Sequence, residues 1–182
     1  IIGFVFCALS MVRMMTVSGG LLALVRSLQK LIIGPKSAQG VTALLGCLMF
    51  IDDYANTMIV GSTMKRVTDR YGISREKLAF IVDATSAPIA GVALVSTWIG
   101  YEVGLFSDMV KKFSWPVDGY SVFLDAVPFR FYCFFMLAFV FINILFGRDF
   151  GPMARAQAQA NPYPSEEESL SGHLLASVLP LG

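Results

Sequence analysis

Long apolar stretches alternate with short clusters of charge along the chain, and this pattern predicts helices embedded in a membrane. A helix needs about 20 apolar residues to cross a hydrocarbon core of about 30 Å. Four segments reach that length, at residues 4–25, 38–64, 78–101 and 119–147. The last contains the plainest apolar run, because Phe131–Gly147 carries no charge. We expect residues 119–147 to form an ordinary spanning helix.

Basic residues place both ends of the second segment on the same side of the membrane. Arg26, Lys30 and Lys36 precede it, and residues 65–77 follow it with five Lys or Arg side chains. Cytoplasmic loops carry an excess of these residues, so both flanks are predicted to lie inside. A re-entrant hairpin over residues 38–64, with its tip at Asp52–Thr57, fits this arrangement. The alternative is one tilted span that puts residues 26–36 outside.

The remaining topology follows from that hairpin. Residues 78–101 lead outward, residues 102–118 form an external loop, and residues 119–147 return. The polar, low-complexity residues 148–173 are expected to be a flexible cytoplasmic loop, and residues 174–182 to begin the next membrane segment. The prediction is therefore an all-α integral membrane region over residues 1–147, part of a longer multi-pass chain in a bacterial inner membrane.

The composition agrees with the membrane class. The chain is 55% hydrophobic and 15% charged, with a mean hydropathy of +0.66, whereas soluble domains keep about 25% of their residues charged. A net charge of +1 gives no field that would attract nucleic acid. Three cysteines without CxxC spacing and a single histidine argue against disulfides and zinc sites.

Asp52 and Asp53 provide the strongest functional signal in the sequence. Carboxylates inside an apolar segment are costly and usually face an ion or proton pathway. Asn56 and Thr57 follow closely and add oxygen ligands of the kind that hard cations bind. The alternative is that the acid pair caps a helix starting at Tyr54, where carboxylates are common.

A second signal lies in the middle of the third segment, at Asp83, Thr85, Ser86 and Pro88. Proline lacks an amide hydrogen and clashes with the preceding turn, so we expect the helix to break there. Broken membrane helices are tolerated where they line a cavity, and in secondary transporters they bind substrates and ions. These residues are therefore predicted to lie beside the hairpin tip, within reach of a shared cation.

Several sequence blocks occur in a recognisable order. They are FIDDYANT (50–57), VGSTM (60–64), ISREKLA (73–79), VDATSAP (82–88), STWIGYE (96–102) and FGRDFGP (146–152). Together they resemble the NhaC family of sodium/proton antiporters. The resemblance implies an ion-transporter-type fold of two inverted repeats with re-entrant hairpins, of which this chain would contain the first repeat. Ala55-Asn56-Thr57 is similar to the Ser-Asn-Thr hairpin tips of related sodium-coupled carriers, with Ala in place of Ser.

The acid pair suggests a mechanism of exchange. Two neighbouring carboxylates in a poorly hydrated cavity do not both stay ionised without a cation, so sodium entry would displace a proton. The sequence therefore predicts a transporter, not an enzyme, which exchanges sodium for protons without a cofactor. Its expected partners are lipids, the two ions, the second repeat of the same chain and a second copy in a homodimer.

Other functions compete with this one. Exchange of small organic anions is the alternative that the same family resemblance permits. A magnesium-dependent membrane enzyme would need further carboxylates three or four residues after Asp53, where Asn56 and Thr57 stand, and an intramembrane aspartyl protease would need a GxGD motif, which is missing from this sequence. The buried acid pair argues against a purely structural subunit.

Overall fold

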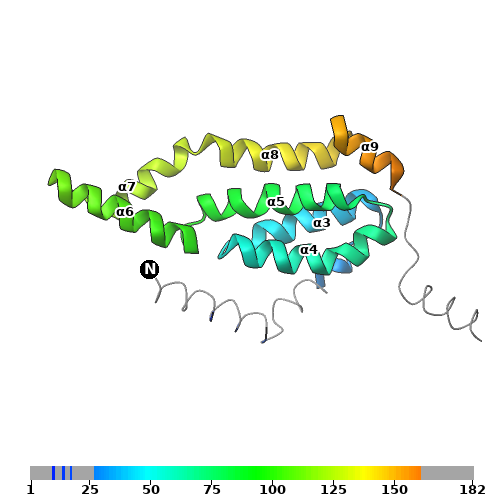
Figure 1. Ribbon diagram of the computed structural model, residues 1–182, viewed down its shortest axis with the longest axis horizontal. Helices are drawn as coiled ribbons and strands as arrows, with labels where there is room; N and C mark the ends of the chain where they lie inside the picture. The colour runs from blue at the N-terminus through cyan, green and yellow to red at the C-terminus, as the bar shows by residue number, and fades with distance from the viewer. Residues whose placement is uncertain (1–9, 11–13, 15–16, 18–26, 161–182) are drawn as a thin grey trace, which may run out of the picture.

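The computed structural model describes residues 10, 14, 17 and 27–160, and the described residues form helices joined by short connections (Figure 1). The elements are α3 (Pro35–Leu48), α4 (Asp53–Arg70), α5 (Arg75–Val92), α6 (Thr97–Phe113), α7 (Gly119–Ala126), the 3-10 turn η1 (Val127–Phe129), α8 (Phe131–Phe146) and α9 (Gly151–Gln159). The expected helix over residues 4–25 lies almost entirely outside the described residues, and residues 161–182 lie fully outside them.

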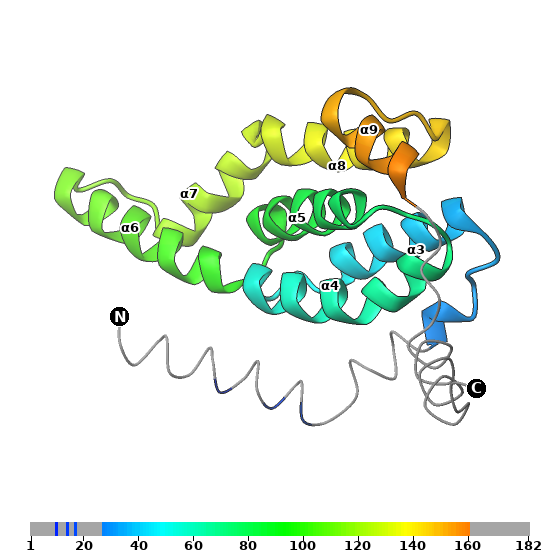
Figure 2. The ribbon, with the colours of Figure 1, turned by 45° about the vertical axis from the view of Figure 1, so that its right-hand side comes forward.

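Helix α5 lies at the centre of the packing, with α3 and α4 on one side and α8 on the other (Figures 1 and 2). One apolar cluster joins α3, α4 and α5 through Leu45, Val60 and Val82, which are almost fully buried. A second cluster joins α3, α5 and α8 through residues that include Ile81 and Val140. Neighbouring helices therefore hold α5 on two sides, and this packing fixes where its side chains lie.

The second apolar segment forms two helices instead of one continuous span. Helix α3 ends at Leu48, α4 begins at Asp53, and the two run antiparallel (Figures 1 and 2). Asn56 holds the reversal, because its Nδ2 donates hydrogen bonds to the carbonyl oxygens of Gly46 at 2.7 Å and Met49 at 3.1 Å. These bonds satisfy carbonyls that the end of α3 leaves unpaired. The helical hairpin is present, and its insertion into a membrane stays a prediction.

The expected break at Pro88 is wrong, because α5 continues through this proline to Val92. Proline removes a single backbone hydrogen bond, and the buried surroundings of α5 keep the helix intact beyond that gap. The chain bends instead at residues 93–96, where Ser96 starts α6. Its hydroxyl accepts a hydrogen bond from Ile99 N at 3.2 Å and donates one to Ala90 O at 2.8 Å. The break therefore lies beyond the site residues and not among them.

The expected ordinary spanning helix over residues 119–147 is also bent. Helix α7 and η1 end before Arg130, whose backbone leaves the helical region, and α8 then starts at Phe131. Arg130 forms an ion pair with Glu102 of α6, which holds the bend in place. Residues 102–118, expected to be an external loop, belong largely to α6.

Helix length within the described part of the chain can be compared with membrane thickness. No single helix there is both long and apolar enough to cross a membrane. Two bent pairs reach the required length and composition together, namely α5 with α6, at 41°, and residues 119–129 with α8, at 46°.

Residues 148–160, expected to be flexible, contain α9 and pack against the α4–α5 turn. Gln157 of α9 donates a hydrogen bond to Gly72 O at 2.7 Å and accepts one from Ser74 N at 3.0 Å. Lys77, with 1% of its side chain exposed, forms an ion pair with Asp149 and donates to Asn143 Oδ1 at 2.5 Å. The basic stretch over residues 65–77 is mostly helical too, since α4 extends to Arg70 and α5 begins at Arg75.

Candidate functional site

The hairpin tip and the middle of α5 meet through two hydroxyl groups. Thr57, in the first turns of α4, donates a hydrogen bond from Oγ1 to Ser86 Oγ at 3.3 Å. Asp83 lies one helical turn before Ser86, and residues three apart on a helix are neighbours on its surface. The structure therefore brings Thr57, Asp83 and Ser86 together, although α5 does not break beside them.

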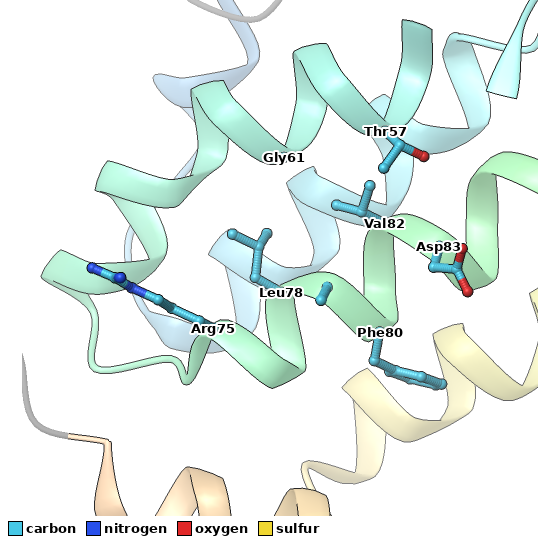
Figure 3. A pocket seen from close by; sticks show the side chains of 8 residues that line it. Thr57, Gly61, Arg75, Leu78, Phe80, Val82 and Asp83 are labelled. Carbon is cyan, nitrogen blue, oxygen red and sulfur yellow. The ribbon is translucent and has the colours of Figure 1, made fainter. Parts of the chain in front are cut away.

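A groove lies between α4 and α5 beside this group of residues, and Ser86, which is buried, is not part of its lining. The groove has a volume of about 560 Å³, within the range of ligand-sized pockets. Thr57 and Asp83 line it together with Gly61, Arg75, Leu78, Ala79, Phe80 and Val82 (Figure 3). Gly61 and Ala79 keep it open because they have little or no side chain. Asp83 is exposed, and among the described residues its carboxylate has no hydrogen-bond or ion-pair partner.

Asn56 lies next to Thr57 but faces α3. Its side chain is fully buried and, as described above, both of its amide hydrogens are used. Its Oδ1 accepts no hydrogen bond from the described residues. A buried acceptor left unpaired costs about 1–3 kcal/mol, and a cation or a water molecule relieves that cost.

Thr85 faces α3 and not the groove. Its hydroxyl donates to Ile81 O at 2.8 Å, and its side chain packs directly against Gly46. Thr85 is thus a buried contact between two helices, while its neighbour Ser86 reaches Thr57.

Asp52 and Asp53 make their contacts with α6. Asp52 caps α4 by accepting from Ala55 N at 2.8 Å through Oδ1, and its Oδ2 accepts from Thr97 Oγ1 at 3.0 Å. Asp53 Oδ1 accepts from Tyr54 N at 3.0 Å and from Trp98 Nε1 at 2.9 Å. The capping interpretation of the acid pair therefore holds for Asp52, and both carboxylates also bind the start of α6.

The seven predicted ion-binding residues thus fall into three groups. Thr57 and Asp83 line the groove and Ser86 contacts Thr57 beside it, while Asn56 and Thr85 are buried against α3. Asp52 and Asp53 face α6. In the part of the chain that the structure describes, no three His, Cys, Asp or Glu side chains gather in a way that would hold a metal ion.

The sequence analysis placed Thr97 and Trp98 in the STWIGYE block and Lys77 in the basic stretch over residues 65–77, but it predicted none of their contacts. Thr97 and Trp98 each lie 45 residues from the aspartate that they contact, so no local pattern links them. For Lys77 a signal existed, because its partner Asp149 lies in the FGRDFGP block that carried part of the family resemblance.

Comparison with known proteins gives an independent view of the chain. Residues 89–181, slightly more than half of it, match the sequence model of a family described as the Na+/H+ antiporter family. An uncharacterized protein of Haemophilus influenzae is 31% identical over 175 residues, which cover 92% of this chain and 33% of the relative. The chain therefore spans about a third of the length of that curated relative. No solved structure matches the chain.

Proposed function

Because this chain belongs to the Na+/H+ antiporter family, we propose that the full-length protein exchanges sodium ions for protons across a membrane. The family consists of membrane-embedded transporters. The observation that carries the proposal for this chain is the contact between Thr57 and Ser86, because Ser86 lies one helical turn from Asp83 and Thr57 lines the same groove as Asp83.

Asp83 is the carboxylate that exchanges the two ions. It is exposed to the groove and free of partners among the described residues, so it can bind either a proton or a cation. Asp52 and Asp53 differ from it, because hydrogen-bond donors of α4 and α6 bond both oxygens of Asp52 and Oδ1 of Asp53. We therefore assign the exchange step to Asp83 and not to the acid pair.

The hydroxyl groups of Thr57 and Ser86 supply neutral oxygen ligands. Hard cations prefer oxygen ligands, and hydroxyl, amide and carboxylate oxygens all serve. Asn56 Oδ1 adds a buried amide oxygen that lacks a donor among the described residues. A dehydrated sodium ion at the tip would give that oxygen a partner. Asn56 would then bind the ion directly or hold a neighbouring ligand in place.

Antiport follows from competition and alternating access. A protonated Asp83 is neutral and no longer attracts sodium. A bound sodium ion balances the charge of the carboxylate in place of the proton. If the loaded groove opens to one side of the membrane at a time, each sodium that leaves is replaced by protons without any covalent chemistry. The protein then acts as a transporter, and no bond is made or broken.

The proposal also covers the subfamily of the protein, its topology in the membrane and its assembly. The sequence blocks favour the NhaC type, with the α3–α4 hairpin re-entering the membrane and the two bent helix pairs crossing it. The remaining two thirds of a full-length chain would supply the second repeat, the cell membrane of a bacterium would hold the protein, and a homodimer is the expected assembly. Exchange of organic anions stays the alternative, and the groove, which is lined by both Asp83 and Arg75, does not favour an anion by its charge.

Transport by the full-length protein in sealed vesicles tests the proposal. A pH-sensitive dye inside the vesicles reports proton movement when a sodium gradient is applied. We expect Asp83→Asn to abolish sodium-driven proton movement, since an amide keeps the shape but does not exchange a proton. Asp108→Asn is the matched control, because Asp108 is an exposed carboxylate of α6 outside the groove. Full exchange in the Asp83→Asn variant would contradict the proposal.

A further inference from the structure

The acid pair joins the starts of two helices that are distant in sequence. Asp52 accepts from the Thr97 hydroxyl at 3.0 Å, and Asp53 accepts from the Trp98 indole at 2.9 Å. A backbone bond lies beside them, in which Thr97 N donates to Ile51 O at 2.9 Å. We call these three hydrogen bonds the clasp. They connect the hairpin tip to the first two residues of α6.

The charge of the pair suits this position. Helix N-termini carry a partial positive charge, which favours carboxylates nearby. Asp52 is the N-cap of α4, and through the clasp both carboxylates also lie at the N-terminus of α6. Asp52 and Asp53 therefore balance the partial positive charge at the N-termini of both α4 and α6. This explains why two adjacent acids are present where one cap would be enough.

The clasp also connects the two halves of the cation site. Thr57 lies one turn after Asp53 on α4, while Asp83 and Ser86 lie on α5. Helix α5 is joined to α6 through residues 93–96, and Ser96 ties that bend to Ala90 O at 2.8 Å. A shift of α6 relative to the tip would therefore change how α4 faces α5, and with it the separation of Thr57 from Ser86.

We propose that Asp52 and Asp53 are positioning residues, which hold the tip against α6 and so set the affinity of the Asp83 site for sodium. This inference rests on the proposed function. It gives the acid pair a role that is distinct from proton exchange, and it adds Thr97 and Trp98 to the residues that determine ion affinity.

Thr97 allows the most specific test, because its hydroxyl contacts Asp52 without being near the groove residues. In vesicles that contain the full-length protein, we expect Thr97→Val to raise the KM for sodium about tenfold or more, the effect of one lost hydrogen bond to a charged group. The maximal rate should stay close to that of the wild type. Thr97→Ser keeps the hydroxyl and should restore the wild-type KM.

Trp98 gives a readout that does not depend on transport. In a full-length protein whose other tryptophans, Trp115 included, are replaced by phenylalanine, the emission of Trp98 reports its surroundings. We expect Asp53→Ala to shift that emission to longer wavelength without sodium present, because the indole loses its partner and gains water. Asp108→Ala is the control and should leave the spectrum unchanged.

The outcomes separate this inference from the proposed function. If the wild type exchanges sodium for protons and Thr97→Val has the wild-type KM, the positioning role is overturned while antiport stands. If Asp53→Asn abolishes exchange and Asp83→Asn does not, the acid pair itself carries the proton, and both assignments are wrong. If the wild type shows no exchange, the proposed function fails, and the effect of Asp53→Ala on Trp98 alone decides whether the clasp exists.

Discussion

Gly46 of α3 and Thr85 of α5 lie so close together that a Cβ atom on Gly46 would stand 2.1 Å from Thr85 Oγ1. Thr85 has no room to move away, because it is fully buried and its hydroxyl is bonded to Ile81 O. This crossing sets the distance between the hairpin and α5, and thereby the position of the adjacent tip.

Gly46→Ala should destabilise the protein for that reason. Overpacking of a tight contact costs about 1–3 kcal/mol, and we expect a loss of that size in the free energy of unfolding, measured by denaturation in detergent. Gly40→Ala is the matched control, because Gly40 lies in the same helix with nothing within 4 Å of its added Cβ. Alanine there should be neutral or stabilising by about 0.5–1 kcal/mol. Equal effects of the two substitutions would contradict the close crossing of α3 and α5.

Lys77→Met should also destabilise the protein. The substitution leaves Asp149 and the Asn143 amide without their cationic partner in a mostly buried place, and breaking such a pair costs about 3–5 kcal/mol. Lys65→Met is the control, because Lys65 is exposed on α4, and the expected change there is below about 0.5 kcal/mol. Thermal unfolding in detergent measures both, and the double variant Lys77→Met with Asp149→Asn should recover part of the loss.

Asn56→Ala should remove a stabilising effect of sodium. Ligands that bind only the folded state raise its stability as their concentration rises. If Asn56 Oδ1 contributes to the cation site, sodium should raise the melting temperature of the wild type more than that of Asn56→Ala. The variant also loses two buried hydrogen bonds to α3, so its melting temperature should be lower even without sodium. Potassium in place of sodium provides the salt control, and equal sodium responses in both proteins would count against this role.

The start of α7 should loosen at low pH. Hydrogen bonds from the Ser121 side chain and backbone lower the pKa of Asp118 below its ordinary value of 3.8. A lowered pKa in the folded state means that the carboxylate stabilises α7 above pH 3.8, and that this contribution is lost as the pH falls through the folded-state pKa. Hydrogen exchange at Tyr120 and Ser121, whose amides donate to Asp118, should show protection that decreases over this range.

Asp118→Asn is the matched variant for that experiment. The amide keeps an oxygen acceptor for the capping bonds but does not titrate. Its protection should be lower than that of the wild type at neutral pH and should not change as the pH falls. A pH dependence like that of the wild type would assign the loosening to another group.

Local sequence predicted the helical segments of α3, α4, α5 and α8 and the reversal between α3 and α4, but it assigned most of α6 and all of α9 to loops. The apolar period, the charged flanks and the capping residue Asp52 all lie within a few residues of the structure that they specify. Such features depend on neighbouring residues alone, and sequence therefore reveals them.

Sequence alone did not predict where the helices bend. A proline in an apolar segment indicated a break at Pro88, but packing on several sides keeps α5 helical there, and the chain bends at residues 93–96. In the same way, the bend before α8 lies at Arg130, where a distant residue, Glu102, forms an ion pair that no local pattern predicted. The free-energy cost of a bend depends on the neighbours that the segment contacts, and these come from other parts of the chain.

The candidate site shows the same division. The order of residues along the chain shows that acids, hydroxyls and amides occur in segments otherwise apolar, and it led to the hypothesis of an ion site because such groups are costly in a membrane. The packing of the helices fixes which of these groups meet: Thr57 meets Ser86 beside Asp83, and Asp52 and Asp53 meet residues 45 positions away. The physical reason is that side-chain identity sets the chemistry available, whereas the crossing of α3, α4 and α6 with α5 sets the distances.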